Sequence, residues 1–240
     1  MYSDLFCRIY DEYGWNYYPE AFADKVLIWI KKNGLRIRNT LDLACGTGIF
    51  SHILSEHGIE AEGMDLSEDM IRIARERRPD LRFEAADMIT YDPGRTYDLV
   101  TCNGDALNHI LDPADLDKIF SNVYGYLNPG GFLIFNVLRS DEKPDEEPFD
   151  FDMEDGRKVT FRICQDADGI INFHIKVVKP GQEPFEEVIR EVFHDPDMLC
   201  GLLRKNGFDV LRRSGQLLEE DEDGREPTCI IVARKGQDSA

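Results

Sequence analysis

Short apolar runs alternate with helix-like stretches through the middle of the chain, and this alternation constrains the fold more than any other feature. The apolar runs that are typical of strands span 40–44, 60–65, 81–85, 97–102 and 131–137. The helix-like stretches between them span 48–57, 67–78 and 113–127. Strands separated by helices run parallel, because each helix carries the chain back along the sheet. The pattern therefore predicts an α/β fold, in which a parallel sheet has helices on both faces.

The ends of the chain extend this pattern. Residues 1–38 hold aromatic, helix-like segments, with Phe22, Val26 and Ile30 at helical spacing, so we expect a helical N-terminal cap. Near the other end, Asp195 and Pro196 open a helix that runs to residue 205. The last two strands are expected at 208–213 and 228–233.

Between the two halves of this pattern, the period of the apolar residues changes to two. Segment 140–155 holds nine acids and two prolines, which predicts an exposed connection. The alternating runs 158–164, 170–178 and 185–193 follow it, separated by glycine-containing turns. We therefore expect three parts: a cap (1–38), a core (39–139 and 195–240) and a small antiparallel β insert (140–194).

Acidic residues dominate the charge of this 240-residue chain, with 47 acids against 28 bases and a formal net charge of −19. A surface of that sign repels nucleic-acid backbones and anionic lipid, which argues against both as partners. The N-terminus lacks the pattern of a signal peptide and no apolar stretch is membrane-length, so we expect a cytoplasmic protein. Six widely spaced cysteines without a Cys-x-x-Cys pair predict reduced thiols and no metal site.

The segment 41–48, Leu-Asp-Leu-Ala-Cys-Gly-Thr-Gly, runs from a strand into a glycine turn that opens a helix. Gly46 and Gly48 allow a ligand to approach the backbone, and the helix N-terminus presents unpaired N–H groups. Asp65 ends the next strand, where a carboxylate accepts hydrogen bonds from both hydroxyls of a ribose. The turn and Asp65 together predict a nucleoside cofactor.

NAD is one candidate for that cofactor, because Gly46-x-Gly48 matches part of the dinucleotide-binding fingerprint. The third glycine of that fingerprint is replaced by Ser51, and Asp42 would repel a pyrophosphate while attracting an ammonium group. S-adenosylmethionine has a ribose, an ammonium group and a sulfonium cation but no phosphate. It therefore fits the residues better than NAD does.

Taken in order, the motifs of the chain resemble those of the class I S-adenosylmethionine-dependent methyltransferases. The resemblance covers residues 38–138 and returns from residue 195 to the end. Its motifs lie at 42–48, 63–70, 86–88, 97–109 and 127–135. The resemblance implies a Rossmann-like, doubly wound sheet of seven strands, whose last strand is antiparallel and whose cofactor is S-adenosylmethionine.

The resemblance also implies roles for individual residues. The backbone of the glycine turn would hold the methionine part of the cofactor, Asp42 its ammonium group and Asp65 its ribose. Asp87 would accept a hydrogen bond from the adenine amine, or be a solvated loop acid instead. The positions implied for cofactor binding are Asp42, Ala44, Gly46, Gly48, Asp65, Leu66, Asp87, Met88 and Asn103.

Methyl transfer from a sulfonium requires alignment of the reacting atoms more than it requires a strong base. If an amine or hydroxyl is the acceptor, Asp105, His109 and His174 are candidates for removing its proton. Each has an alternative: Asp105 as the cap of the following turn, and the histidines as structural hydrogen-bonding groups. Asp105 and His109 are our candidates for the catalytic residues.

The acceptor pocket is expected between the loop after residue 102, the insert as a lid on the acceptor side, and the aromatic cap. The aromatic residues that either close over the cofactor or hold the cap to the sheet are Tyr10, Tyr13, Trp15, Tyr17 and Tyr18. The insert resembles that of small-molecule methyltransferases, and the negative charge suits a cationic amine. A small-molecule acceptor with an N- or O-nucleophile is therefore expected, on a monomer or homodimer.

Two other functions remain open at the level of sequence. The first is an NAD-dependent oxidoreductase. The second is a catalytically silent cofactor-binding module, in which the acidic segments 141–155 and 219–223 dock a basic partner.

Overall fold

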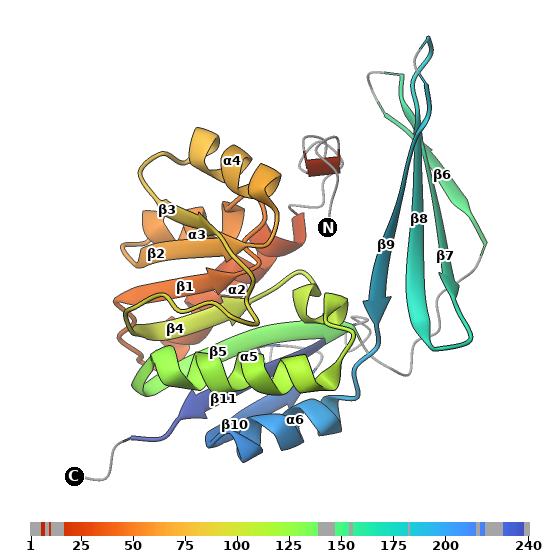
Figure 1. The fold of residues 1–240 in the computed structure, drawn as a ribbon. Helices are drawn as coiled ribbons and strands as arrows, with labels where there is room; N and C mark the ends of the chain where they lie inside the picture. Colours follow the sequence, from red (N-terminus) through yellow and green to blue (C-terminus); the bar gives the residue numbers. More distant parts are fainter. Residues whose placement is uncertain are drawn as a thin grey trace.

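A seven-stranded sheet forms the centre of the computed structural model, which describes residues 6–7, 10, 17–138, 147–153, 156–181, 183–214, 217–218 and 228–237. The strand order is β10-β11-β5-β4-β1-β2-β3 (Figure 1). The bounds are β1 (Asn39–Leu43), β2 (Glu60–Asp65), β3 (Arg82–Ala85), β4 (Tyr97–Cys102), β5 (Leu127–Leu138), β10 (Phe208–Ser214) and β11 (Thr228–Lys235). Strand β11 is antiparallel to β5 and β10, whereas β1 to β5 pair in parallel. The expected Rossmann-like sheet with an antiparallel last strand is confirmed.

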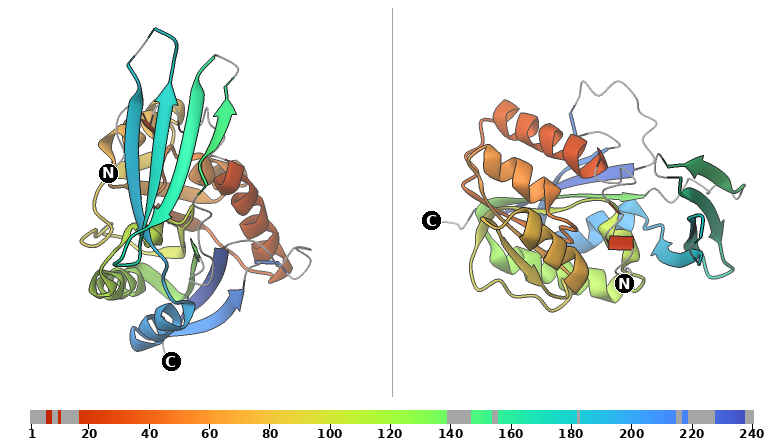
Figure 2. Two further views of the ribbon diagram at one scale, coloured as in Figure 1. Left: turned by 90° about the vertical axis from the view of Figure 1, so that its right-hand side faces the viewer. Right: turned by 90° about the horizontal axis from the view of Figure 1, so that it is seen from above.

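Helices cover both faces of this sheet (Figure 2). Helices α2 (Tyr17–Lys32) and α3 (Ile49–Glu56) bury their apolar sides in one cluster with β4, β5 and β11, and α5 (Pro113–Tyr126) and α6 (Pro196–Lys205) do so on the opposite face. Helix α4 (Glu68–Arg77) packs through Ala74 on Phe83. No helix in the described part of the chain is long and apolar enough to cross a membrane.

The expected helix starts are confirmed by their capping contacts. The Ser67 hydroxyl accepts a hydrogen bond from the Met70 amide at 3.3 Å and begins α4. Asp112 and Asp195 accept from the amides of Ala114 and Asp197, and each is followed by a proline at the first helical position. These caps satisfy N–H groups that have no partner inside the helix.

A second, four-stranded antiparallel sheet stands beyond the carboxyl ends of the parallel strands (Figure 1). It consists of β6 (Phe149–Asp152), β7 (Lys158–Gln165), β8 (Ile170–Val178) and β9 (Phe185–Val192). The expectation of an exposed connection over 140–155 is wrong at β6, which pairs with β7. Phe149 and Phe151 stack on Phe161, while Asp150 pairs with Lys158 at 2.7 Å. The neighbouring acids conceal this alternation in the sequence.

Two sets of contacts join the second sheet to the core. Its inner face shares an apolar cluster with Met70 and Ile73 of α4, and Phe6 and Cys7 belong to the same cluster. At the other junction, the buried Asn108 donates to the Val192 carbonyl at 2.7 Å and accepts from the Leu138 amide at 3.0 Å. Asn108 therefore ties the strand that leaves the core to the strand that returns to it.

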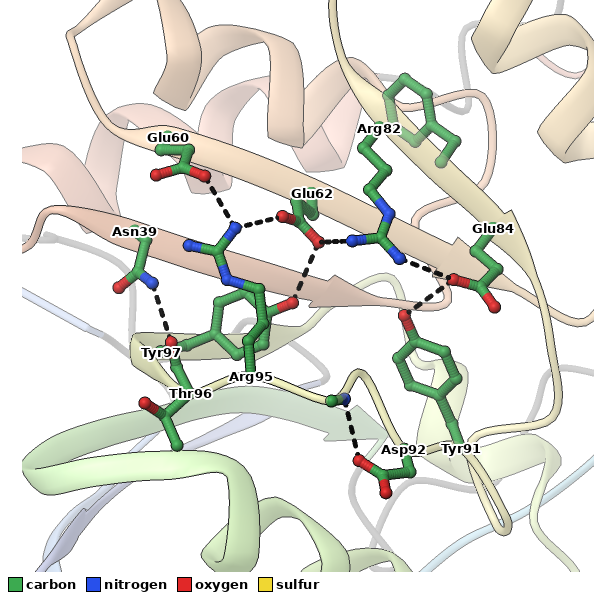
Figure 3. Close-up of polar contacts among 12 residues, drawn as sticks. Asn39, Glu60, Glu62, Arg82, Glu84, Tyr91, Asp92, Arg95, Thr96 and Tyr97 are labelled. Carbon is green, nitrogen blue, oxygen red and sulfur yellow. Dashed lines mark hydrogen bonds and ion pairs between the residues drawn. The ribbon is translucent and has the colours of Figure 1, made fainter.

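A buried acid holds the segment that connects β3 to β4 against the sheet (Figure 3). Glu62 of β2 lies 2.6 Å from Nη1 of Arg95 and accepts a hydrogen bond from the Tyr97 hydroxyl at 3.0 Å. Nη1 of Arg82 lies 3.6 Å from the same carboxylate. Because residues 87 and 88 belong to this connection, the network positions part of the cavity described below.

We expect Glu62→Ala to lower the free energy of unfolding by about 2 kcal/mol, because it leaves the buried Tyr97 hydroxyl without its acceptor and removes one of the two carboxylates that contact Arg95. Glu60→Ala is the matched control, since Glu60 contacts the same Nη1 of Arg95 at 2.7 Å but is exposed. This control should cost less than about 0.5 kcal/mol. Urea unfolding followed by circular dichroism measures both values, and equal losses would contradict the assignment.

Candidate active site

A cavity of about 400 Å³ opens at the carboxyl ends of β1, β2 and β4. Strands β1 and β4 are neighbours in the sheet although β2 and β3 lie between them in sequence, so the chain reverses its direction of winding at this point. Ligands of open α/β sheets bind at such a reversal. Residues of β9 and Tyr10 line the opposite side of the cavity.

The turn after β1 has an unusual backbone. Ala44 and Gly46 both have φ of 55°, in the left-handed region, and both line the cavity. A Cβ on Gly46 would meet nothing within 4 Å, so this glycine serves the conformation and leaves space beside the backbone. Gly48 does not line the cavity, and a Cβ there would lie 2.6 Å from the ring of Phe83. The packing of Phe83 therefore explains why residue 48 is a glycine.

Asp65 lies at the end of β2, at the wall of the cavity. Its Oδ2 accepts a hydrogen bond from the Gly46 amide at 2.9 Å, and its Oδ1 accepts one from the Ser67 amide at 2.9 Å. Burial raises the pKa of Asp65, and these backbone N–H groups act against that rise. The carboxylate thus joins the glycine turn to the start of α4 and retains lone pairs for a ligand.

Asp42 is fully buried beneath the cavity rather than in its wall. It accepts hydrogen bonds from the Thr101 hydroxyl at 2.9 Å, the Ser51 hydroxyl at 3.2 Å and the Asn103 amide at 3.2 Å. Burial raises the pKa of Asp42 to about 7, and the charge of Asp65 adds to the rise. Asp42 therefore reaches the cavity through Asn103, which does line it.

Leu66, Asp87 and Met88 lie along the part of the cavity wall nearest β2 and β3. Leu66 is 52% exposed, which is unusual for a leucine and leaves an apolar surface beside Asp65. The Asp87 carboxylate is exposed and accepts a hydrogen bond from the Ile89 amide at 2.9 Å. This wall therefore combines two apolar side chains with one acceptor.

Asp105 begins the 3₁₀ helix η1 (Ala106–His109) but does not cap it with its side chain. Its Oδ1 accepts a hydrogen bond from Nδ2 of Asn136 at 2.6 Å instead, and Oδ1 of Asn136 accepts from the Gly104 amide. Burial raises the pKa of Asp105 to about 6. Asp105 is not a lining residue, although its neighbours Gly104 and Ala106 are.

His109 lines the cavity at the end of η1. Its Nδ1 lies 3.2 Å from the Arg190 carbonyl of β9, and its Nε2 lies 3.7 Å from Oε1 of Glu191. Burial lowers the pKa of His109, so the ring is neutral at pH 7. His174, the other histidine candidate, is exposed on β8 and is not a lining residue.

Of the five aromatic residues expected at the acceptor site, the structure describes Tyr10, Tyr17 and Tyr18, and among these three only Tyr10 lines the cavity. Tyr10 lines the cavity, and burial raises its pKa to about 12, with contributions from the charges of Asp105 and Asp65. Tyr18 stacks on Phe22 at 5.6 Å between ring centres, and Tyr17 is 75% exposed. Tyr13 and Trp15 lie outside the described residues.

Several polar residues around the cavity were not expected from the sequence. Asn136 is a buried amide in an otherwise apolar strand, and this break in the apolar run was the available signal. Glu187 and Glu191 lie on the less exposed face of β9. However, both faces of that strand carry charged residues. Nothing in the local sequence distinguishes them from Glu186 and Arg190.

The cavity fits the chemistry of an adenosyl cofactor with an amino-acid part. The open backbone at Gly46 accommodates a chain beside it, the Asp65 carboxylate accepts from hydroxyl groups, and Leu66 and Met88 offer apolar surface for a flat ring. Among the described residues that line it, Asp65, Asp87 and Glu187 are acidic, and Arg190 is the one arginine or lysine. This balance favours a cationic ligand over one that carries a pyrophosphate.

Residues 40–131 match the family model described as a methyltransferase domain. A dTDP-3-amino-3,6-dideoxy-α-D-glucopyranose N,N-dimethyltransferase of Streptomyces fradiae is 30% identical over 132 residues, which are 55% of this chain and 51% of that protein. The chain thus spans about half of the length of that relative. A Geobacillus protein named as a methyltransferase is 25% identical over 227 residues, 90% of this chain and 91% of its own.

Solved structures share the fold over almost the whole chain. One of them is CalS10, an amino pentose methyltransferase of Micromonospora echinaspora with S-adenosylmethionine bound. The match covers 98% of this chain and 98% of the CalS10 chain, with a TM-score of 0.77 and 22% sequence identity. At that identity the likeness shows the fold alone. The comparisons therefore show a match to a methyltransferase domain over residues 40–131 and a fold shared with solved S-adenosylmethionine-dependent methyltransferases over almost the whole chain.

Proposed function

We propose that this chain is an S-adenosylmethionine-dependent methyltransferase and that it transfers the methyl group to a nitrogen atom of a small molecule. The observation that carries the proposal is the composition of the cavity, because its described lining holds three acidic residues against one arginine. An acidic cavity attracts an amine, which is a cation in water. The amino sugar named as the substrate of the Streptomyces fradiae relative belongs to the same acceptor chemistry.

We assign the cofactor to the half of the cavity formed by β1, β2 and β4. Ala44 and Gly46 would hold the methionine part, Asp65 and Leu66 the ribose, and Asp87 and Met88 the adenine. Asp42 and Gly48 would act from behind the wall, Asp42 by orienting Asn103 and Gly48 by giving Phe83 room. When bound, the cofactor supplies an electrophilic methyl group, and these residues hold that group at the centre of the cavity.

The acceptor is assigned to the half of the cavity that Tyr10, η1 and β9 enclose. In this assignment the insert is a lid on the acceptor side, which is supported by the four consecutive lining residues of β9, 187–190. Excluding water helps a displacement at a sulfonium, because water would otherwise compete with protein groups for contacts to the acceptor and to its charge. Asp105 and His109, our candidate catalytic residues, belong to this half.

The proposed location is the cytoplasm. All six cysteines are free thiols, and five of them are buried, which suits a reducing compartment.

Asp65→Asn should raise the dissociation constant of S-adenosylhomocysteine by roughly 10-fold to 100-fold, because an amide accepts fewer and weaker hydrogen bonds than a carboxylate. Isothermal titration calorimetry measures this constant. Asp92→Asn is the matched control, because Asp92 likewise accepts from a backbone amide, that of Gly94 at 2.9 Å, but lies in an exposed loop. Unchanged affinity in the Asp65 variant would contradict the site assignment.

The same calorimeter separates this proposal from the other two functions. We expect S-adenosylhomocysteine to bind and NAD to show no saturable heat. Tight binding of NAD alone would instead support an oxidoreductase. Cofactor binding without turnover of any acceptor would support a silent module.

The nature of the acceptor atom is tested with pairs of small molecules that differ only in bearing an amine or a hydroxyl at the same carbon. Mass spectrometry of the products, with S-adenosylmethionine as donor, should show methylation of amines and at least about 10-fold less of the hydroxyl partners. Aminocyclohexanols, amino sugars and their hydroxyl counterparts form a suitable panel. Faster methylation of the hydroxyl members would show that oxygen is the acceptor.

A further inference from the structure

Arg190 of β9 is the one arginine or lysine among the described residues that line the cavity, and methyl transfer to an amine gives it no role. It is exposed, and its guanidinium makes no ion pair or hydrogen bond within the described part of the chain. Such an arginine stands out in a chain with 47 acids against 28 bases. Arg190 therefore has its positive charge and its five N–H donors available for a ligand.

The alternation of β9 places Arg190 on the outer face of the second sheet, which is turned toward the viewer in the left view of Figure 2. Phe185 and Ile189 have the opposite phase and belong to the apolar cluster between this sheet and α4. Val188 shares the face of Arg190, is 50% exposed and also lines the cavity. Because Val188 and Arg190 both line the cavity and are exposed, the cavity opens onto the outer face at these two residues.

Contacts with η1 hold this end of β9 at the mouth of the cavity. The Arg190 carbonyl lies 3.2 Å from Nδ1 of His109, and Asn108 donates to the Val192 carbonyl at 2.7 Å. Leu111 follows η1, lines the cavity and is 41% exposed. Exposed apolar surface from η1 and from β9 therefore lies beside Arg190 at the mouth.

Two further groups lie next to Arg190 on the outer face. The register pairs Arg190 with Asn172 of β8, Val188 with His174 of β8, and His174 with Arg162 of β7. Directly opposite residues have their Cβ atoms about 5 Å apart, and diagonal neighbours lie about 7–8 Å apart. His174 is thus diagonal to Arg190 and directly opposite Arg162. We call these three residues, Arg162, His174 and Arg190, the outer basic row.

Acids farther along the outer face have lysine partners of their own. Asp150 lies 2.7 Å from Nζ of Lys158, and Glu186 lies 2.6 Å from Nζ of Lys176. Asp166, in the turn after β7, accepts hydrogen bonds from two backbone amides of its own turn. In the described part of the chain, no carboxylate forms an ion pair with the outer basic row. The row therefore keeps its positive charge.

The chemistry of the row favours a single oxyanion group as its ligand. A guanidinium matches the two oxygens of a carboxylate or of a phosphate, because its N–H groups form a planar fork. Two arginines are few for a nucleic-acid backbone, which the net charge of −19 would also repel. A small molecule that enters the cavity can reach Arg190 at the mouth, since this residue belongs to the lining.

We propose that Arg190, with His174 and Arg162 beside it, binds an oxyanion group that the acceptor carries apart from its amine. This inference rests on the proposed function and adds a second charged group to the acceptor. The amine enters the acidic cavity, the middle of the acceptor lies on Val188 and Leu111, and the carboxylate or phosphate meets the guanidinium at the mouth. The acceptor is therefore a zwitterion, and each of its charges lies near protein groups of the opposite sign.

The test compares ring amines with and without an oxyanion group. One pair is trans-4-aminocyclohexanecarboxylate and cyclohexylamine, and the other is glucosamine 6-phosphate and glucosamine, so that the two pairs distinguish a carboxylate from a phosphate. Saturation-transfer NMR on the full chain, saturated with S-adenosylhomocysteine, gives the dissociation constant of each probe. In at least one pair, the oxyanion-bearing member should bind about threefold to 10-fold more tightly. Added salt should reduce this preference, because it screens exposed charges.

Arg190→Gln should abolish the preference for the oxyanion-bearing member, because the amide has no charge and no planar fork. Arg162→Gln should reduce the preference by about twofold, since Arg162 lies farther from the mouth. Affinity for S-adenosylhomocysteine should stay within about twofold in both variants, because both residues are exposed and lie apart from the cofactor half. Lys176→Gln is the matched control, since it removes one positive charge from the same face but from a lysine that Glu186 already neutralises. It should leave the preference unchanged.

Equal affinity for both members of each pair, or a preference that survives Arg190→Gln, overturns the inference. A preference that Lys176→Gln reduces as much as Arg190→Gln does also overturns it, because the overall charge of the face would then be its cause. If Arg190→Gln no longer binds S-adenosylhomocysteine, the reduced preference in Arg162→Gln decides. The proposed function fails separately, if no amine is methylated although the oxyanion-bearing amine binds through Arg190.

Discussion

The buried carboxylate of Asp42 is the contact on which the arrangement of the site depends. A charged group in the middle of a sheet is stable only if donors replace its lost water, and Thr101, Ser51 and Asn103 supply them. These donors come from β4, from α3 and from the segment after β4. One acid therefore fixes a strand, its neighbour in the sheet and the following helix relative to one another at the reversal of winding where the cavity opens.

The two halves of the cavity differ in how they are built. The half nearest β2 depends on backbone groups, since Asp65 is held by the amides of Gly46 and Ser67. The half nearest β9 depends on side-chain amides, because Asn136 holds the loop at Asp105 and Asn108 joins β5 to β9. Backbone contacts tolerate changes in side chains, whereas a side-chain amide is lost by one substitution. The first half is accordingly less sensitive to single substitutions than the second.

Features that depend on residues close together in the sequence could be predicted from it, whereas features that depend on residues far apart in the sequence could not. The strands of the core, the capped helix starts and the position of Asp65 follow from local periods and turns, and the structure has them within a few residues. Strand β6 escaped prediction because its acids resemble a loop, although Phe149 and Phe151 alternate with them. Asn108 and Asn136 owe their roles to partners 30 to 84 residues away, which no local pattern encodes. Gly48 illustrates a further limit, since a motif glycine that suggests ligand approach here makes room for Phe83.

The net charge of −19 was the first argument against nucleic acid, but it counts every acid as ionised. Burial raises the pKa of Asp42 to about 7, of Asp105 to about 6 and of Glu191 to about 8. Near neutral pH these three groups are therefore partly protonated, and the region behind the cavity carries less negative charge than its composition implies. A cation that enters the cavity stabilises the ionised forms, so that ligand binding and proton release are coupled there. The exposed acids attract cations of any kind. The buried acids bind a cation only as they release protons, so their contribution depends on pH.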